Sequence, residues 1–154
     1  MSCLEVLSDS YLASGSFDNS IKIWFFINGT LIYNLLNHAA PVTSLKLLNN
    51  GYLASGSHDH TIKIWNWTSS STIYTLIGHT DKVLSLELIQ NGSLASSSAD
   101  YTIRIWNYET GLFIKELIGH TDNVLCLKYL NDDLMASGSA DRTIKIWNVA
   151  LGIL

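Results

Sequence analysis

A repeat with a fixed period of 41 residues runs through the whole sequence. Its most visible marker is an Ile-Lys/Arg-Ile-Trp stretch, whose tryptophans are Trp24, Trp65, Trp106 and Trp147. No insertion or gap interrupts the spacing of these four copies. A period of this length is typical of repeat architectures, in which each repeat is one supersecondary unit and neighbouring repeats complete its core.

One period is predicted to contain four short strands. We place these strands at residues 42–48, 53–57, 61–66 and 72–77, and the pattern recurs in the other copies. The segments are rich in β-branched and aromatic residues and are too short for typical helices. The turn signal Asn49-Asn50-Gly51 separates the first two strands, and a tight turn around Asp59 joins the next two. No segment of the chain predicts a helix.

The predicted strands carry apolar side chains on both faces. Ile62 and Ile64 are expected to point to one side of the sheet and Trp65 to the other, because side chains alternate along a strand. By the same alternation, Leu45 and Leu47 are expected to lie opposite Val42 and Leu48. Small sheets that need cover on both faces can obtain it from copies of themselves packed around an axis, which leaves only short strand edges exposed.

Three further signatures recur at the same period. Gly-His occurs at Gly78-His79 and Gly119-His120, and a Ser-x-Ser-x-Asp element begins in every repeat at Ser14, Ser55, Ser96 and Ser137. With the Ile-Lys/Arg-Ile-Trp stretches, these motifs make the whole chain resemble WD40-repeat proteins. Asn or Phe follows the tryptophan here, and Asn37 stands in the place of glycine before His38. Neither departure removes the indole or the imidazole.

The resemblance implies an all-β fold, a WD40-type β-propeller with about four four-stranded antiparallel blades. Residues 1–154 then form one array, with repeats at approximately 1–37, 38–78, 79–119 and 120–154. The first and last repeats are incomplete, and Gly152-Ile153-Leu154 is expected to begin a fourth strand. WD40 propellers most often have seven blades. The chain is therefore expected to be part of a longer propeller, or to join a second copy of itself in one ring.

The resemblance also implies a chain of side-chain hydrogen bonds within each blade. A buried indole N–H needs an acceptor, and a serine hydroxyl can accept this bond while it donates to an imidazole that in turn donates to an aspartate. The expected sets are His38, Ser55, Asp59 and Trp65; His79, Ser96, Asp100 and Trp106; and His120, Ser137, Asp141 and Trp147. The first repeat supplies Ser14, Asp18 and Trp24 but has no histidine at the corresponding position.

Serine, histidine and aspartate also form hydrolase triads, so a catalytic interpretation has to be considered. Three copies in one chain, each with its serine occupied by an indole, favour a structural role, and no catalytic residue is predicted. A propeller enzyme would need long loops that bring catalytic groups to the axis, and the uninterrupted period leaves no room for them. His58 and His60 lack the further ligands that a zinc site needs, so neither a metal nor a cofactor is expected.

Positions beside the turn aspartate differ among the repeats, whereas the framework positions recur. Family resemblance places these turns, and the loops that follow Gly-His, on one face near the propeller axis, which commonly binds peptides. Aromatic residues and arginine often dominate interfaces. The partner-binding candidates are Phe17, Asn19, His58, His60, Tyr101, Arg142, Asp81, Lys82, Asp122 and Asn123. The alternative is neutral variation at exposed turns.

Composition limits the classes of partner. The net charge of −4 gives no electrostatic footprint for nucleic acid, and no apolar run reaches membrane-spanning length. The start of the chain does not read as an export signal, so an intracellular location, cytoplasmic or nuclear, is expected. Cys3 and Cys126 share one repeat position and are expected to fill small buried strand sites without forming a disulfide.

The sequence therefore predicts a non-enzymatic WD40 repeat scaffold that presents a face to protein or peptide partners. The resemblance carries most of this prediction, because a fold alone does not specify a function. The alternative is a sensor or substrate-recognition part of a larger regulatory protein, such as a signalling NTPase or a ubiquitin-ligase receptor.

Overall fold

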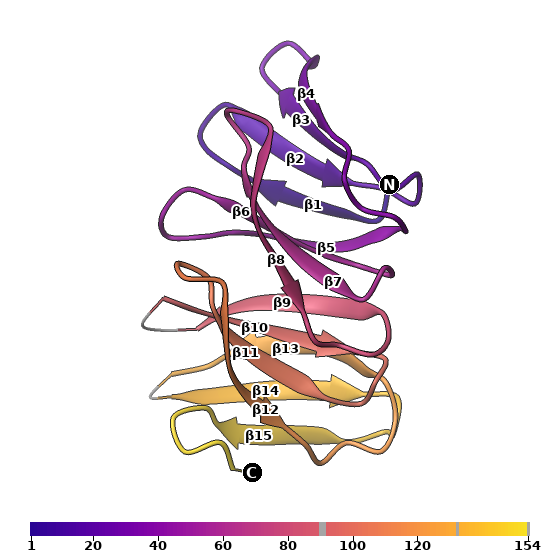
Figure 1. The fold of residues 1–154 in the computed structure, drawn as a ribbon, viewed down its shortest axis with the longest axis vertical. Coiled ribbons are helices and arrows are strands. Elements are labelled where there is room, and N and C mark those ends of the chain that lie inside the picture. Colours follow the sequence, from indigo (N-terminus) through magenta and orange to yellow (C-terminus); the bar gives the residue numbers. More distant parts are fainter. Residues whose placement is uncertain (90–91, 132, 154) are drawn as a thin grey trace.

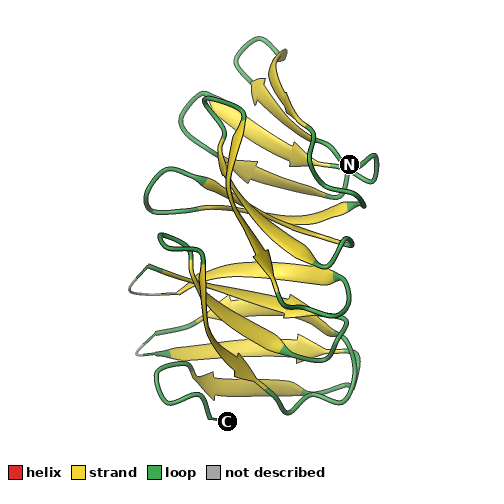
Figure 2. Cartoon of the chain, in the orientation of Figure 1, coloured by secondary structure: helices red, strands yellow, loops and turns green. Residues whose placement is uncertain are grey.

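The structure is a computed structural model that describes residues 1–89, 92–131 and 133–153. In these residues all regular secondary structure is β-strand, arranged in four antiparallel sheets and joined by turns and loops (Figure 2). The predicted all-β architecture is confirmed. We call the sheets blades 1 to 4, in chain order.

Each blade is a meander in which consecutive strands are neighbours. Blade 1 contains β1 (Cys3–Val6), β2 (Tyr11–Gly15), β3 (Ile21–Phe25) and β4 (Thr30–Leu35). Blade 2 contains β5 (Val42–Leu47), β6 (Leu53–Ser57), β7 (Thr61–Asn66) and β8 (Ser71–Ile77). Blade 3 contains β9 (Val83–Ile89), β10 (Ser93–Ser98), β11 (Ile103–Asn107) and β12 (Leu112–Leu117). Blade 4 contains β13 (Val124–Tyr129), β14 (Leu134–Ser139) and β15 (Ile144–Asn148).

The strand boundaries follow the sequence prediction closely in blade 2, where β6 and β7 begin and end at the predicted residues. The expected fourth strand of blade 4 is not formed in the part of the chain that the structure describes. Gly152 lies in a turn, and Ile153 makes only an isolated bridge to Asn148, so this blade has three strands. Leu154 lies outside the described residues.

The four blades follow one another along the longest dimension of the molecule (Figure 1). Their first strands, β1, β5, β9 and β13, contact one another from blade to blade. The last strands, β4, β8 and β12, lie at the opposite edge of each sheet. This arrangement places one continuous row of first strands along the inner side of the array.

The hydrophobic core lies between blades rather than within them. Between blades 2 and 3, Ile62 and Ile64 pack with Leu94 and Trp106 in one buried cluster. Equivalent residues form the clusters between blades 1 and 2 and between blades 3 and 4. In every case the Ile-x-Ile face of one blade covers the tryptophan face of the next, as expected for a sheet that cannot bury either face alone.

One predicted alternation is wrong. Val42 lies on the same side of blade 2 as Leu45 and Leu47, in the cluster shared with blade 1, whereas Leu48 belongs to the cluster shared with blade 3. The pairing of β5 with β6 shifts register between Val42 and Ser44. A β-bulge at this point inserts one extra residue, so Val42, which precedes it, points to the face opposite to the one expected from strict alternation.

The prediction for the cysteines is also wrong in part. Cys3 is partly buried and packs against the cluster between blades 1 and 2, but Cys126 is exposed on blade 4. The two residues have equivalent positions in their sheets. Cys126 is exposed because its face of blade 4 has no neighbouring blade within the described residues.

Burial between blades predicts the effect of leucine truncation. Leu94→Ala removes a fully buried side chain from the cluster between blades 2 and 3, and we expect it to lower the free energy of unfolding by about 2–5 kcal/mol. Leu112→Ala in the same blade is the matched control, because Leu112 is 65% exposed, and its loss should be under about 1 kcal/mol. Urea denaturation followed by tryptophan fluorescence measures both. Equal losses would contradict a core located between the blades.

Candidate functional site

The turns between the second and third strands have one shared geometry. In blade 2, His60 N–H donates to the carbonyl oxygen of Ser57 at 3.3 Å, and His60 has a φ of 69°. This is a tight turn followed by a left-handed residue, a common three-residue hairpin connection. Equivalent left-handed residues with φ between 70° and 73° are Asn19, Tyr101 and Arg142.

The turn aspartate holds this geometry and ties it to the preceding loop. Asp59 Oδ1 accepts hydrogen bonds from Thr61 N–H at 3.0 Å and from the Thr61 hydroxyl at 2.7 Å. Its Oδ2 accepts from His38 at 2.7 Å and from Ala39 N–H at 3.0 Å. One carboxylate therefore fixes both the hairpin and the loop that leads into the blade.

The remaining links form a continuous line of bonds into the sheet. His38 Nε2 lies 2.7 Å from Ser55 Oγ, and Trp65 Nε1–H donates to the same hydroxyl at 2.8 Å. The matching links in blade 3 measure 2.7, 2.8 and 2.8 Å, and those in blade 4 measure 2.6, 2.8 and 2.7 Å. The histidine and tryptophan rings also meet edge to face, 6.0 to 6.3 Å apart.

These bonds determine what the serines can do. Because the indole donates to the Ser55 oxygen, the hydroxyl hydrogen is directed to His38 Nε2, and Nδ1–H of the same imidazole donates to Asp59. Ser55 and Ser96 are completely buried, and Ser137 is nearly so. A hydroxyl that is buried and bonded on both sides is not placed to attack a substrate, so these sets hold the blade together.

The aspartates are held in their charged form. Burial by itself raises the pKa of Asp59 and of Asp100, but hydrogen bonds from histidine, threonine and a backbone N–H outweigh it, so each pKa lies well below the usual range. The pKa of Asp141 is lowered chiefly by its bond from Thr143. The hydroxyl of Ser20 does the same for the pKa of Asp18.

Blade 1 contains only part of this arrangement. Trp24 Nε1–H donates to Ser14 Oγ at 2.8 Å, and Asp18 accepts a bond from Ser20 N–H at 3.0 Å. Asp18 also lies 3.5 Å from Lys22 Nζ, in an exposed ion pair. Asp18 is exposed, whereas Asp59 and Asp100 are largely covered.

Two columns of hydroxyl residues complete the site, and the sequence prediction gave neither of them a place in the hydrogen-bond network. Ser57 Oγ accepts from Asp59 N–H and donates to the carbonyl oxygen of Ala40, both at 3.0 Å. Thr61 supplies the bonds to Asp59 described above. The signal was present in the sequence, because each column keeps a hydroxyl at every repeat: Ser16, Ser57, Ser98 and Ser139, and Ser20, Thr61, Thr102 and Thr143.

The turns and the loops that precede each blade lie together. His58 N–H donates to the carbonyl oxygen of Pro41, Ala99 N–H to that of Lys82, and Ala140 N–H to that of Asn123, each at 2.9 Å. In these loops Asp81 and Asp122 bond to the next backbone N–H at 2.7 Å. We define the loop edge as the turns at 16–20, 57–61, 98–102 and 139–143 with the loops at 36–41, 77–82 and 118–123.

The partner-binding candidates are all on the loop edge, and none of them is buried. Phe17 is 64% exposed and Tyr101 is 46% exposed. His60 Nε2 lies 4.0 Å from Asp81 Oδ1, so candidates from blades 2 and 3 meet across the gap between the sheets. The pKa of His58 is lowered, first by burial and then by the nearby ammonium group of Lys82.

The loop edge also contains an apolar column that the sequence prediction did not include. Leu36, Ile77 and Ile118 are spaced by the repeat period and directly precede Asn37, Gly78 and Gly119. Their exposed fractions are 70%, 76% and 70%. Large apolar side chains that stay exposed at the same position in three blades are candidates for contact with a partner.

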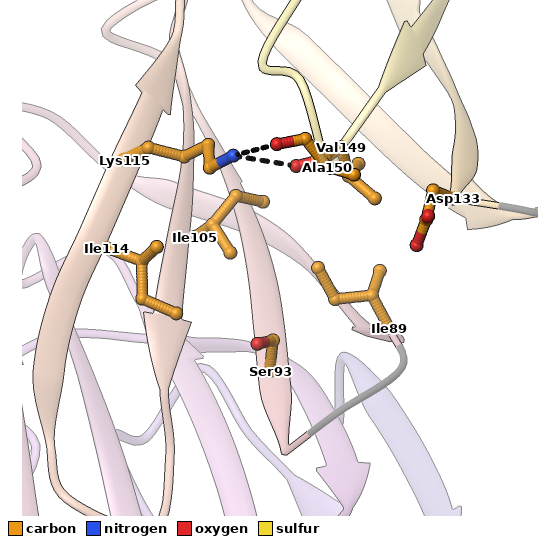
Figure 3. A pocket seen from close by; sticks show the side chains of 8 residues that line it. All are labelled: Ile89, Ser93, Ile105, Ile114, Lys115, Asp133, Val149 and Ala150. Atoms are coloured by element: carbon orange, nitrogen blue, oxygen red, sulfur yellow. Dashed lines mark hydrogen bonds between the residues drawn. The ribbon is translucent and has the colours of Figure 1, made fainter.

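A pocket of about 230 Å³ lies between blades 3 and 4, away from the loop edge (Figure 3). Ile89, Ile105 and Val149 line part of it. Lys115 Nζ on its wall donates to the carbonyl oxygens of Val149 at 2.9 Å and Ala150 at 2.7 Å. Because the ammonium group is bound to backbone carbonyls, it ties the end of blade 4 to blade 3 and is not directed at a ligand.

Among the described residues, no three His, Cys, Asp or Glu side chains converge as a metal site would require. Within the same residues, no helix is long and apolar enough to cross a membrane.

Comparison with known families decides the identity of the repeats. The model of the family "WD domain, G-beta repeat" matches residues 2–24, 29–66, 70–107 and 111–148. The chain belongs to the WD40 family. A search of curated proteins found no match. The WD40 repeats of this chain therefore account for its recurring Ser, His, Asp and Trp positions.

Three solved structures resemble this chain, and they differ in how much of their own length it covers. The computationally designed Ika4 protein is 31% identical, with a TM-score of 0.82 over 91% of this chain and 86% of that one. U3-55K is 28% identical and the WD40 repeats of RRP9 are 29% identical, both with a TM-score of 0.90 over 98% of this chain. This chain spans about half of the U3-55K and RRP9 chains, 49% and 48%.

The hydrogen bonds that Asp100 accepts predict how its replacement by asparagine changes the stability of the fold. Asp100→Asn replaces one acceptor oxygen with an NH₂ group where four donors converge, and we expect a loss of about 1–3 kcal/mol in the free energy of unfolding. Asp18→Asn is the matched control, because Asp18 has no histidine partner and is exposed, and its effect should be smaller. Thermal denaturation of both variants tests this. An unchanged melting temperature for Asp100→Asn would contradict the network.

The lowered pKa of Asp100 predicts how the difference in stability between wild type and Asp100→Asn changes with pH. A carboxyl whose folded pKa lies below its unfolded value of about 3.9 stabilises the fold fully above that pH, and the stabilisation is lost as the pH falls through the folded pKa. The stability gap between wild type and Asp100→Asn should therefore be largest near pH 5 to 7 and shrink below about pH 4. Urea denaturation across this range measures the gap. A gap that stays constant down to pH 2.5 would exclude titration of Asp100 as its source.

Proposed function

We propose that the loop edge binds a protein or peptide partner and that the chain works as a non-enzymatic interaction scaffold. WD40 repeat domains typically have this role. The observation that carries the proposal is the contrast at each turn. The same hydrogen bonds fix the backbone around the aspartate in the blades, while the residues on either side of it differ and lie at the surface.

The residue types at these positions support the proposal. Phe17, Tyr101 and Arg142 belong to the classes that contribute most to protein interfaces. Their backbone is already held by the turn, so little conformational freedom of the main chain is lost when a partner binds. Leu36, Ile77 and Ile118 add exposed apolar area to the same edge.

The overall charge supports a protein rather than a nucleic acid as the partner. The chain has a net charge of −4, and the loop edge mixes acidic residues such as Asp81 and Asp122 with basic residues such as Lys82 and Arg142. A nucleic-acid site would require a predominantly basic surface.

The two cysteines of the chain are unpaired, which is consistent with a location inside the cell, in the cytoplasm or the nucleus.

The test uses residues that the chain itself carries at equivalent positions. Phe17→Ala copies Ala99 and Ala140, while Tyr101→Asn and Arg142→Asn copy Asn19, which has the same left-handed backbone. The triple variant should therefore fold normally and lose the partners that wild type recovers, by about tenfold or more in a quantitative pull-down.

The control variant changes three exposed residues at the opposite edge of the sheets, Ile27→Ala, Glu109→Asn and Leu112→Ala. Its circular dichroism spectrum and its recovery of partners should match wild type. Equal recovery of partners by the wild type and by the loop-edge triple variant would reject the loop edge as the binding site.

A further inference from the structure

Blade 4 exposes a face that is buried in every other blade. Ile21, Ile62 and Ile103 are completely buried, but the equivalent Ile144 is 77% exposed. The second isoleucine of the motif behaves in the same way. Ile23, Ile64 and Ile105 are 0% to 2% exposed, whereas Ile146 is 45% exposed. This face, with Cys126, forms the open face of blade 4.

Blade 1 exposes the complementary face. Leu45, Leu86 and Leu127 are at most 8% exposed, but the equivalent Leu4 is 49% exposed. Met1 is 77% exposed, whereas Val42, Val83 and Val124, at the same position in the other blades, are completely buried. Leu4, Leu12 and Trp24 line a hollow of about 350 Å³ here, which we call the open face of blade 1.

The two open faces are the two halves of a contact that the chain already makes three times. At each junction between blades, an Ile-x-Ile face covers a tryptophan and leucine face. Blade 4 presents the first kind of face and blade 1 presents the second. Within the described residues neither face has a neighbour, so the chain carries both sides of a fourth junction.

Charges on the inner strands identify what fits this junction. One repeat position on these strands alternates in sign, with Glu5, Lys46, Glu87 and Lys128. Lys46 Nζ reaches forward to Glu87 Oε2 on the next blade, at 2.7 Å. Glu87 Oε1 in turn accepts bonds from Tyr129 N–H at 3.2 Å and from Lys128 at 3.0 Å.

Glu5 occupies the same position as Glu87, but among the described residues no lysine pairs with it from the preceding side. Its Oε1 accepts from Leu47 N–H at 2.8 Å, which matches the bond of Glu87 to Tyr129. Lys128 has the position of Lys46, and its side chain is 73% exposed compared with 26% for Lys46. By analogy with Lys46, Lys128 is placed to pair with a glutamate on a blade that follows blade 4. By analogy with Glu87, Glu5 is placed to pair with a lysine on a blade that precedes blade 1.

We propose that a second copy of this chain fills both positions, so that two copies associate head to tail through the open face of blade 4 and the open face of blade 1. Lys128 of each copy then pairs with Glu5 of the other. The alternation of charges continues without a break around the ring, because two chains of four blades give an even number, eight.

The symmetry of a pair allows the two contacts to close on each other. Two identical head-to-tail contacts related by a two-fold axis close into a ring of two copies, whereas contacts at another angle would give a larger ring or an open filament. Burial of Ile144, Ile146 and Leu4 would supply the apolar part of each contact.

The first measurement is the mass of the 154-residue chain in solution. Sedimentation velocity at low micromolar concentration should give a single species of twice the 17.1 kDa of one chain. A folded monomer that persists at 100 µM would overturn the proposal, because it would show that the two open faces do not bind each other. A series of growing species would also overturn it, because it would show an open filament rather than a closed pair.

The decisive measurement exchanges the two charges between separate variants. In Glu5→Lys alone, and in Lys128→Glu alone, like charges meet at both junctions, and we expect each dimer to weaken by about tenfold or more. In a mixture of the two variants, Lys128 meets Glu5 at one junction and the exchanged pair meets at the other. The mixture should form heterodimers with an affinity close to wild type.

The mixture experiment distinguishes loss of the contact between two copies from structural changes within each variant. Each substitution also disturbs a bond in its own copy, to Leu47 or to Glu87, and those disturbances are the same with or without the other variant. Circular dichroism of each variant confirms that it is folded. If the mixture is no more dimeric than its components, Lys128 and Glu5 do not pair between copies and the proposal is wrong.

A second pair of variants tests the apolar contact independently. Ile144→Asp places a charge on the open face of blade 4 and should abolish the dimer while the monomer remains folded, because this side chain is 77% exposed in one chain. Ile118→Asp is the matched control, since Ile118 is 70% exposed on the loop edge and outside both open faces. A dimer that survives Ile144→Asp, or one that is lost in Ile118→Asp, would contradict the assigned surface.

Discussion

The architecture depends on the fact that no blade of this chain can bury its own apolar surface. Each sheet carries isoleucines on one face and a tryptophan with leucines on the other, and both faces need cover. The period of 41 residues satisfies this need, because every blade presents the same two faces and fits both of its neighbours. Stability is then shared along the array, as in other repeat proteins, and each junction contributes to the stability of the blades on both sides.

The hydrogen-bonded line from tryptophan to aspartate solves a second problem, which is how an outer loop is fixed to a sheet. In blade 2 it runs from the indole of Trp65, buried at the junction, to the carboxylate of Asp59 at the loop edge. The residues involved are polar, yet every donor and acceptor on the line has a partner, so their burial is not penalised by unsatisfied groups. A rigid core and an ordered binding surface are thus parts of one connected structure.

Much of this could be predicted from the sequence. The repeat period, the strands of blade 2 and the all-β architecture follow from the spacing of the tryptophans and from the β-branched segments, because these patterns are local. The bulge beside Val42 was missed because strict alternation places Val42 and Leu45 on opposite faces, whereas one extra residue between them brings both to the same face. The exposure of Cys126 was missed for another reason. An equivalent position in a repeat is buried only if a neighbouring blade is present to cover it.

Left-handed backbone at Asn19, His60, Tyr101 and Arg142 restricts the chemistry that the loop edge can use. A β-branched side chain is strongly disfavoured in this conformation, whereas asparagine, histidine, aromatic and long basic residues can adopt it. The turn therefore restricts which residues can occupy this position, and none of the four left-handed residues is valine, isoleucine or threonine. New binding specificities on this scaffold would arise from a reduced alphabet of polar, aromatic and basic side chains.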